Sequence, residues 1–364
     1  MRLRTAFSKI IHDLILLNRK LFRLALFARQ FFSGWRINRN PSKDINRILL
    51  IRLQRLGDLM MTKPVIDSIR RKYPNANIDI ITATSAKLLQ PLFIDNIDDW
   101  YCYDSSLYQA DASDSAQKSS LAKALGEYDL IVEFDGDLFT LGLVRAIRPC
   151  RYLSRGFTRF NEILQGKKRQ ESQLELLSMI AEIDIHDFTR SKLGTEKRQK
   201  VIEIHPFSGA RIRDLEPQFW GELILELKSA LPDFQIKLTG YGNEKSAVAA
   251  LARETQSTVY VNDRDVLHRT FRQTVALVIC PDTFTMHFAA GLGTPVIALF
   301  GPQAPERYSS FYPTVHSIYH RVSCSPCGYN NFGIDFCPYN KRCTQLITVG
   351  EVVRKAKELL HDLH

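Results

Sequence analysis

The chain has 364 residues, of which 45% are hydrophobic and 24% charged, and its formal net charge is +10. This composition is typical of a globular protein with room for two domains, and it excludes a disordered or fibrous chain. Residues 1–40 contain nine Lys and Arg but only one acid, so +8 of the net charge lies in this terminal arm. A nucleic-acid-binding protein would carry a basic stripe on its folded body, so we expect no nucleic-acid partner.

Residues 1–46 are predicted to form a basic amphipathic helical extension. Apolar residues recur at helical spacing from position 7 to 32, and basic residues fall on the other side. The longest uncharged runs have four to six residues, too few for a transmembrane helix, and the charges that break the apolar stretch argue against a signal peptide. Such a helix can lie in the interface of an anionic membrane. The alternative is a helix packed on the body of the protein or on a second subunit.

The rest of the chain alternates short apolar runs with helical patterns, in an N-terminal domain at 47–195 and a C-terminal domain at 200–364. Strands are expected at 47–53, 77–84, 127–137, 201–205, 234–240, 257–262, 275–282 and 295–302. Helices are expected at 59–74, 85–93, 216–231, 266–274, 285–293 and 351–363. Alternation of this kind predicts an α/β fold with two Rossmann-like, doubly wound domains and a cleft between them. Ligands of such sheets bind at the carboxyl ends of the strands.

The segment CPDTFTMH, residues 280–287, ends a strand and begins a helix. Backbone N–H groups at a helix N-terminus and the positive end of its dipole bind phosphate. The candidate donor-binding side chains here are Asp282, Thr283, Thr285 and His287. The alternative is structural, with a helix N-cap at Asp282 or Thr283 and a histidine packed in the core.

Two further strand ends offer groups for a nucleotide. HPFSGARIR, residues 205–213, places Ser208, Gly209, Arg211 and Arg213 where a turn and two arginines would clamp a diphosphate; solvated arginines are the alternative. TGYGNE adds Glu244, a carboxylate that can accept hydrogen bonds from a ribose. These loops contain neither GxGxxG nor GxxxxGK[ST], which argues against NAD enzymes and P-loop NTPases.

The first strand of the N-terminal domain runs into QRLGD, which places Asp58 directly after a glycine. A carboxylate in this position is a candidate general base, with an N-cap as the alternative. Asp135 ends another strand of the same domain. Arg52, Arg55 and Lys63 surround Asp58 in the sequence and are candidates, with Asp135, for binding an acidic acceptor.

Seven cysteines without a secretory signal predict a reducing compartment. The last four form C-x2-C-x9-C-x5-C, and they are Cys324, Cys327, Cys337 and Cys343. Four thiolates can close a structural zinc site. Only one CxxC pair is present, so free thiols or an occasional disulfide are the preferred interpretation and no metal is expected.

Taken in order, these motifs resemble glycosyltransferase family 9, the bacterial heptosyltransferases. The resemblance is carried by ILLIRLQRLGDLMMTKPVIDSIRRKYP, by the strand and His-Pro loop, by DTFTMHFAAGLGTPVIALFGP and by the CxPC tail. It extends from residue 47 to about residue 350, and the first 46 residues lie outside it.

The resemblance implies a GT-B fold and an inverting transfer without a metal or other cofactor. It implies a nucleotide-sugar donor such as ADP-heptose and an acidic lipopolysaccharide core or related glycan as acceptor, at the cytoplasmic face of the inner membrane. By resemblance, Asp58 matches the catalytic base and Arg213 falls where the family has a lysine facing the diphosphate. Ser208 matches the phosphate loop, and Glu244 matches the ribose contact. Asp282, Thr283, Thr285 and His287 match the segment that holds the phosphates and sugar.

Phe284 departs from the family pattern, because the family has glycine two residues after this aspartate. A side chain there would crowd the pyrophosphate, stack on the base or select another donor. A non-catalytic relative that binds a nucleotide sugar or glycan during envelope assembly is therefore the alternative function.

Overall fold

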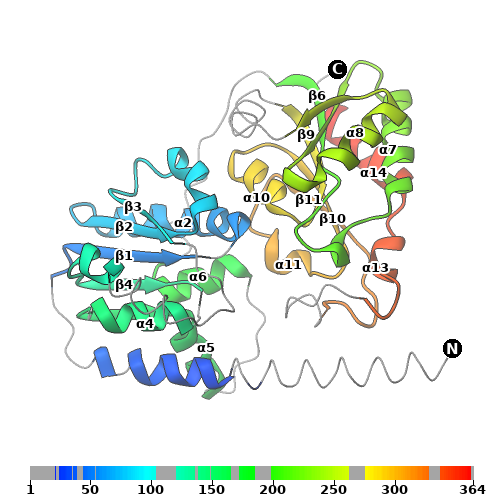
Figure 1. Cartoon of the computed structure of the whole chain (residues 1–364). Coiled ribbons are helices and arrows are strands. Elements are labelled where there is room, and N and C mark those ends of the chain that lie inside the picture. Colours follow the sequence, from blue (N-terminus) through cyan, green and yellow to red (C-terminus); the bar gives the residue numbers. More distant parts are fainter. Residues whose placement is uncertain are drawn as a thin grey trace. The chain divides into compact units, whose positions relative to one another are not determined.

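Figure 1 shows a computed structural model of the chain. The structure describes residues 21, 24–34, 36–38, 44–53, 55–103, 120–135, 138–147, 149–164, 172–184, 198–261, 275–327 and 337–361. These residues form two compact units, an N-terminal unit up to Asp184 and a C-terminal unit from Arg198 onward. Each unit is described separately below.

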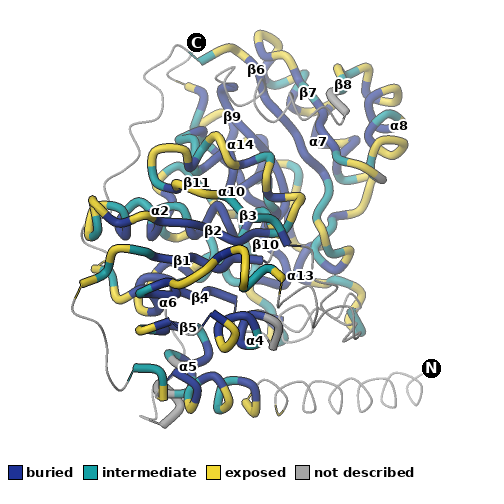
Figure 2. Tube along the Cα trace, turned by 60° about the vertical axis from the view of Figure 1, so that its left-hand side comes forward, coloured by how far each residue is buried: buried dark blue, intermediate teal, exposed yellow. Residues whose placement is uncertain are grey.

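The N-terminal unit contains a parallel sheet of five strands. Their order is β3 (Trp100–Cys102), β2 (Asn77–Thr82), β1 (Arg47–Arg52), β4 (Leu130–Glu133) and β5 (Arg151–Ser154). The helices are α2 (Leu56–Lys72), α4 (Leu138–Ile147), α5 (Arg155–Leu164) and α6 (Gln173–Ala181), with a 3-10 helix η1 (Thr84–Leu92). Strand β1 is a continuous apolar run because both faces of the sheet are covered, and its four central residues are fully buried (Figure 2).

Residues 24–34 are helical and pack on the N-terminal unit. Leu26 and Gln30 are buried, and Arg145 of α4 donates a hydrogen bond to the hydroxyl of Ser33 at 2.9 Å. Beyond this helix, the amide side chain of Asn38 exchanges two hydrogen bonds with the backbone of Tyr152, at 2.8 and 2.9 Å. Asn38 thus satisfies backbone groups on the edge strand β5 that have no strand partner on that side. The part of the predicted extension before residue 21 lies outside the described residues.

The C-terminal unit contains a parallel sheet of six strands. Their order is β11 (Val315–Tyr319), β10 (Val296–Phe300), β9 (Val275–Pro281), β6 (Gln199–Ile204), β7 (Gln235–Gly240) and β8 (Thr258–Val261). The helices are α7 (Pro217–Ala230), α8 (Lys245–Thr255), α10 (Phe284–Gly291), α11 (Pro305–Tyr308), α13 (Arg342–Gln345) and α14 (Val349–Leu360), with 3-10 turns η3 (Arg211–Arg213) and η4 (Gly242–Glu244). Side chains of α7, α8 and α14 share one apolar core with the sheet.

The α/β prediction is confirmed, but several short elements were missed. Strands β3, β5 and β11 have only three to five residues, and most side chains of β3 and β11 are only partly buried, so they lack a distinct apolar run. Neither β5 nor α5 was predicted, and the expected helix at 85–93 is the 3-10 helix η1. Residues 104–119 and the predicted helix at 266–274 lie outside the described residues.

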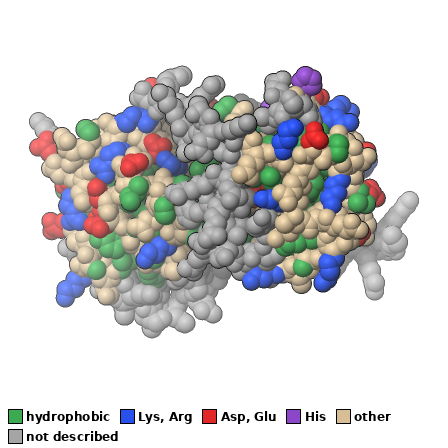
Figure 3. Space-filling model, turned by 90° about the horizontal axis from the view of Figure 1, so that it is seen from above, with side chains coloured by type: hydrophobic (Ala, Val, Ile, Leu, Met, Phe, Trp, Pro, Cys, Tyr) green, Lys and Arg blue, Asp and Glu red, His purple; other side chains and the backbone are tan. Residues whose placement is uncertain are grey.

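Charged side chains are mixed on the face drawn in Figure 3, where blue and red groups alternate over both units. This agrees with the near-neutral charge of the chain after residue 40. No helix in the described ranges is long and apolar enough to cross a membrane.

Candidate functional site

The strand order of each sheet marks one position where polar loops can meet. In both sheets the first strand of the unit lies beside the fourth, β1 beside β4 and β6 beside β9, and the order reverses there. Loops that leave such a pair run to opposite faces of the sheet, and ligands of open α/β sheets bind in the space between them. The predicted loops after β1, β6 and β9 all lie at these switch points.

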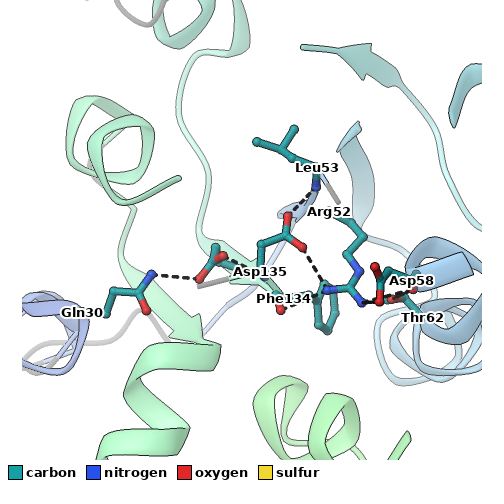
Figure 4. A network of polar contacts seen from close by, with 8 residues as sticks. Gln30, Arg52, Leu53, Asp58, Thr62, Phe134 and Asp135 are labelled. Atoms are coloured by element: carbon teal, nitrogen blue, oxygen red, sulfur yellow. Dashed lines mark hydrogen bonds and ion pairs between the residues drawn. The ribbon is translucent and has the colours of Figure 1, made fainter. Parts of the chain in front are cut away.

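Arg52, the last residue of β1, joins the two loops at the N-terminal switch point (Figure 4). Its guanidinium is buried and donates from Nη1 to the Asp135 carboxylate at 2.9 Å and to the Phe134 carbonyl at 3.1 Å. The second oxygen of Asp135 accepts a short hydrogen bond from the backbone N–H of Leu53. Arg52 and Asp135, both predicted to bind an acceptor, therefore lie inside a buried network and not on the surface.

Asp58 lies in the first turn of α2, at the outer end of this network. Nη2 of Arg52 is 3.4 Å from its Oδ1 and 3.3 Å from its backbone carbonyl, which also accepts a hydrogen bond from the Thr62 hydroxyl at 2.8 Å. The Asp58 side chain remains 26% exposed. A half-buried carboxylate fixed on one side and open on the other has the geometry that a general base needs.

The two remaining acceptor candidates lie near Asp58 in the sequence but have different surroundings. Arg55 is exposed. Lys63 forms an ion pair with Asp67, one helical turn on, at 2.9 Å, and its ammonium lies 5.6 Å from the centre of the Phe93 ring. Arg55 is thus the better placed of the two to meet an acidic group from solvent.

At the C-terminal switch point, Arg213 of η3 joins the loop after β6 to the loop after β9. Its Nη1 donates to the backbone carbonyl of Asp282 at 2.7 Å and is 3.4 Å from the Asp282 carboxylate. The Arg213 side chain is 13% exposed and that of Asp282 7%. Two loops that are 69 positions apart in the chain are therefore held together by one guanidinium.

The turn at 208–214 is held by hydrogen bonds within itself. The N–H of Ser208 donates to the Asp214 carboxylate at 2.8 Å, and the Ser208 hydroxyl donates to the Ala210 carbonyl at 2.6 Å. Gly209 and Arg211 are exposed at its tip. Burial raises the pKa of Asp214, while its hydrogen bonds with Ser208 act in the opposite direction.

Glu244 ends η4, after β7, and is only partly buried. One carboxylate oxygen accepts a hydrogen bond from the N–H of Tyr241 at 2.7 Å, which fixes the side chain beside the strand end. Burial raises the pKa of Glu244. The second carboxylate oxygen is the group that would meet a ribose.

The helix α10 begins at the end of β9, as predicted, with Thr283 at its N-cap. Asp282, Thr283, Thr285 and His287 are all buried, and the His287 ring lies 5.8 Å from that of Tyr312. His287 thus packs inside the unit, as the structural alternative expected. The burial of these side chains leaves the backbone N–H groups at the start of α10 as the candidate phosphate donors of this segment.

Phe284, the first residue of α10, is only partly buried and packs against neighbouring aromatic rings. Its ring centre lies 5.4 Å from that of Phe288, one helical turn on, and 6.5 Å from that of Tyr241 after β7. The side chain therefore rests on its own helix and on the neighbouring loop. This packing is a way for a large side chain to occupy a position where the family has glycine.

A buried polar group beneath these loops was not predicted. Glu203 of β6 is fully buried and accepts a hydrogen bond from the Thr239 hydroxyl at 3.2 Å, and burial raises its pKa to about 7. Two residues on, His205 contacts the Thr239 carbonyl through Nδ1 at 3.1 Å, and burial lowers its pKa to about 4. In the sequence, Glu203 interrupts an apolar strand, which is the signal that could have revealed it.

The four C-terminal cysteines form no disulfide in the described part of the chain and line one small cavity with Ile212 of η3. Burial and the three neighbouring thiols raise the pKa of Cys343 to about 11. Within the described ranges, no three His, Cys, Asp or Glu side chains are arranged to hold a metal ion. Cys327 packs directly on Ile212, so the cysteine cluster supports the turn that carries Arg211 and Arg213.

The comparison with protein families matches mainly the C-terminal unit. A family model described as "Glycosyltransferase family 9 (heptosyltransferase)" matches residues 181–331. The resemblance to glycosyltransferase family 9 is confirmed. The matched range contains the turn at 208–214, Glu244 and the start of α10. The match confirms the prediction of a glycosyltransferase. No curated protein matches the chain.

Several solved structures share the fold. A family 9 glycosyltransferase from Veillonella parvula is 16% identical with a TM-score of 0.68, covering 89% of this chain and 99% of its own. The E. coli ADP-heptose lipopolysaccharide heptosyltransferase II is 16% identical with a TM-score of 0.63, covering 87% and 99%. E. coli heptosyltransferase WaaC with ADP is 15% identical with a TM-score of 0.62, covering 86% and 99%. At this level of identity the likeness shows the fold, and the predicted GT-B fold is confirmed.

Proposed function

We propose that this chain is an inverting, metal-independent glycosyltransferase that moves a sugar onto an acidic lipopolysaccharide core or related glycan. The proposed donor is ADP-heptose. The observation that carries the proposal is the half-exposed Asp58 carboxylate at the β1–β4 switch point, held by the buried Arg52. The family match and the structures of E. coli heptosyltransferase WaaC with ADP and with ADP-2-deoxy-2-fluoro heptose support the donor class.

In this mechanism, the acceptor hydroxyl attacks the anomeric carbon while the bond from that carbon to the phosphate oxygen breaks. Asp58 accepts the hydroxyl proton, and the nucleoside diphosphate leaves with the bonding electron pair. Its growing negative charge has to be met by fixed donors. We assign that role to Arg213 and to the N–H groups at the start of α10. The Nε of Arg213 is a buried donor with no hydrogen-bond partner among the described residues, and a phosphate oxygen that reached it would satisfy it.

The donor site would be completed by the exposed tip of the 208–214 turn and by Glu244. Gly209 and Arg211 present backbone N–H groups and a guanidinium to the diphosphate, which is the pairing that favours phosphate. Glu244 would accept hydrogen bonds from the ribose hydroxyls. Arg55 would meet an acidic group of the acceptor.

The catalytic test is the Asp58→Asn variant of the full chain, assayed by ADP release from ADP-heptose with a heptose-free lipopolysaccharide as acceptor. We expect turnover to fall about 10²- to 10⁴-fold, the usual contribution of a general base, with donor affinity unchanged. A wild-type protein that binds nucleotide sugars but transfers none from a panel of ADP-, GDP- and UDP-sugars would be the non-catalytic relative.

We further propose that residues 1–40 place the enzyme on an anionic membrane surface, at the cytoplasmic side where the acceptor is embedded. The described part of the extension supports this, because Leu21, Leu24 and Phe32 are 41–60% exposed on the outer face of the helix. Arg29 and Arg36 are also exposed there. Apolar groups flanked by arginines suit the interface of anionic lipid.

Vesicle flotation tests the membrane proposal. Wild-type protein should float with phosphatidylglycerol-containing vesicles and not with pure phosphatidylcholine, and the Leu24→Ser/Phe32→Ser variant should remain unbound. The matched control is Leu225→Ser, which removes an exposed leucine of the C-terminal unit. Equal flotation of all three proteins would contradict the proposed role of the helix.

A further inference from the structure

Gln30 is a buried polar residue on a helix that lies outside the region of family resemblance. It is 0% exposed, whereas Leu24 and Phe32 on the same helix are largely exposed. Burying an amide side chain without hydrogen bonds is unfavourable, so a glutamine at the centre of a packing face needs a compensating contact. In the structure, the contact comes from strand β4 of the N-terminal unit, which also carries the proposed base Asp58.

The amide nitrogen of Gln30 donates to Oε2 of Glu133 at 3.3 Å. Glu133 is the last residue of β4 and is also 0% exposed. Its other oxygen, Oε1, accepts a hydrogen bond from the backbone N–H of Asp135 at 2.8 Å. One carboxylate therefore connects the N-terminal helix to the loop that carries Asp135.

The seat of Gln30 is built into α5. A Cβ atom placed on Gly156 would lie 1.6 Å from Oε1 of Gln30 and 2.6 Å from its Cβ and Cδ. No other residue fits at position 156 without displacing the glutamine side chain, because 2.6 Å is shorter than any ordinary carbon–carbon contact. The helix thus docks through a specific side chain in a matched slot.

From Asp135 the contacts continue to the proposed base. The Asp135 carboxylate holds Arg52 at 2.9 Å, and Arg52 holds the side chain and backbone of Asp58 at 3.4 and 3.3 Å. All members before Asp58 are buried, so solvent cannot replace a lost partner. Arg52 donates to the Asp135 carboxylate, and the neutral amide of Gln30 can hold the Glu133 carboxylate in place without competing with Arg52.

We propose that Gln30 is a positioning residue for the reaction, which fixes the Glu133 carboxylate and, through Asp135 and Arg52, the orientation of Asp58. The proposal rests on the function proposed above. It makes the N-terminal helix part of the catalytic unit as well as a candidate membrane contact. Without Gln30, Oε2 of Glu133 loses the hydrogen bond from the amide, the loop after β4 shifts and Asp58 moves from its productive position. A displacement of about 1 Å at a reacting group can cost on the order of 10²-fold in rate.

The experiment compares variants of the full chain in detergent-dispersed acceptor, so that vesicle binding does not enter. Gln30→Met keeps the length of the side chain and removes the amide. We expect it to lower kcat tenfold or more with the KM for ADP-heptose within about twofold, and to move the acidic limb of the pH–rate profile. Ser33→Ala is the matched control, because it removes a docking hydrogen bond of the same helix that does not reach Glu133. It should leave kcat and the pH profile unchanged.

A charge exchange provides a second test that does not depend on how well Gln30→Met folds. Gln30→Glu places two carboxylates together and should inactivate the enzyme, whereas Gln30→Glu/Glu133→Gln restores one amide–carboxylate hydrogen bond and keeps an oxygen for the Asp135 N–H. We expect the double variant to recover at least tenfold of the lost kcat.

The outcomes separate the two proposals. A wild-type kcat and pH profile in Gln30→Met, with an active Asp58-dependent enzyme, would overturn the positioning role alone. So would a double variant no more active than Gln30→Glu. A wild type that transfers no sugar would overturn the proposed function, and the role of Gln30 with it.

Discussion

Replacing Arg52 with methionine is the perturbation that most directly tests the buried network. The guanidinium is 2% exposed and is within 3.4 Å of two carboxylates, of which Asp135 has a fully buried side chain. Methionine fills the volume but removes the guanidinium that lies 2.9 Å from the Asp135 carboxylate. Removing one partner of a buried pair typically costs 3–5 kcal/mol, because the remaining charge is uncompensated. For a unit of about 150 residues, that corresponds to a loss of roughly 6–20 °C in the melting temperature of that unit.

The assay is thermal and urea unfolding of the full chain, followed by circular dichroism at pH 7. Arg52→Met/Asp135→Asn removes both charges and should recover at least 1 kcal/mol relative to Arg52→Met, which a double-mutant cycle would detect. The control is Lys200→Ala, since Lys200 pairs with Asp233 across 3.7 Å with both side chains exposed. It should change stability by less than about 1 kcal/mol. A loss below 1 kcal/mol in Arg52→Met would refute the reasoning, because it would mean that water or another group compensates Asp135.

Two further predictions concern the C-terminal unit. The pKa of Glu203 is raised to about 7, so its protonation increases the free energy of unfolding as pH falls from 7 to 4.5. The pKa of His205 is lowered to about 4, so this residue decreases the free energy of unfolding as pH falls from 6.5 to 4. Glu203→Gln should therefore make the free energy of unfolding fall more steeply on acidification from pH 6.5 to 4.5, by up to about 1.4 kcal/mol per pH unit in urea titrations; an unchanged slope would contradict the raised pKa of Glu203. Phe284→Ala removes a ring that packs on Phe288 and Tyr241 and should destabilise the chain by roughly 1–3 kcal/mol, with the Kd for ADP from calorimetry changed less than threefold. Much tighter ADP binding would instead mean that Phe284 obstructs the diphosphate.

The fold was predictable where the chain repeats a strong pattern. Strands β1 and β9 are continuous apolar runs followed by polar loops and helices, which is how buried parallel strands read in a sequence. Strands β3 and β5 have three and four residues, too few to show a period, and their place in the sheet depends on hydrogen bonds with β2 and β4. Elements that are defined by their neighbours carry little signal of their own.

The positions of the candidate site residues could be predicted from the sequence, but the burial and the contacts of each side chain could not. The rule that ligands bind at strand ends selected Asp58, Arg52 and Asp135. It could not distinguish the partly exposed carboxylate of Asp58 from the buried carboxylate of Asp135. Burial depends on contacts between the ends of β1 and β4, which are more than 80 positions apart in the chain. Gln30 was hidden for the same reason, since its partner Glu133 is 103 positions away and a glutamine on an amphipathic helix looks like a surface residue.

Each switch point has an arginine–aspartate pair, and the pair in the N-terminal unit is the more deeply buried. The difference in burial suits the role proposed for each pair. Arg52 and Asp135 are fully enclosed, so the pair cannot rearrange without exposing a charge, which suits a proposed base that has to keep one orientation. Arg213 and Asp282 are 13% and 7% exposed, and Nε of Arg213 is a buried donor without a partner among the described residues, which suits a pair proposed to share its charge with a phosphate. A base has to be fixed before the acceptor arrives, whereas a diphosphate clamp has to exchange partners when the product leaves. The burial of each pair thus follows from whether its charge must stay in place or be shared with a ligand.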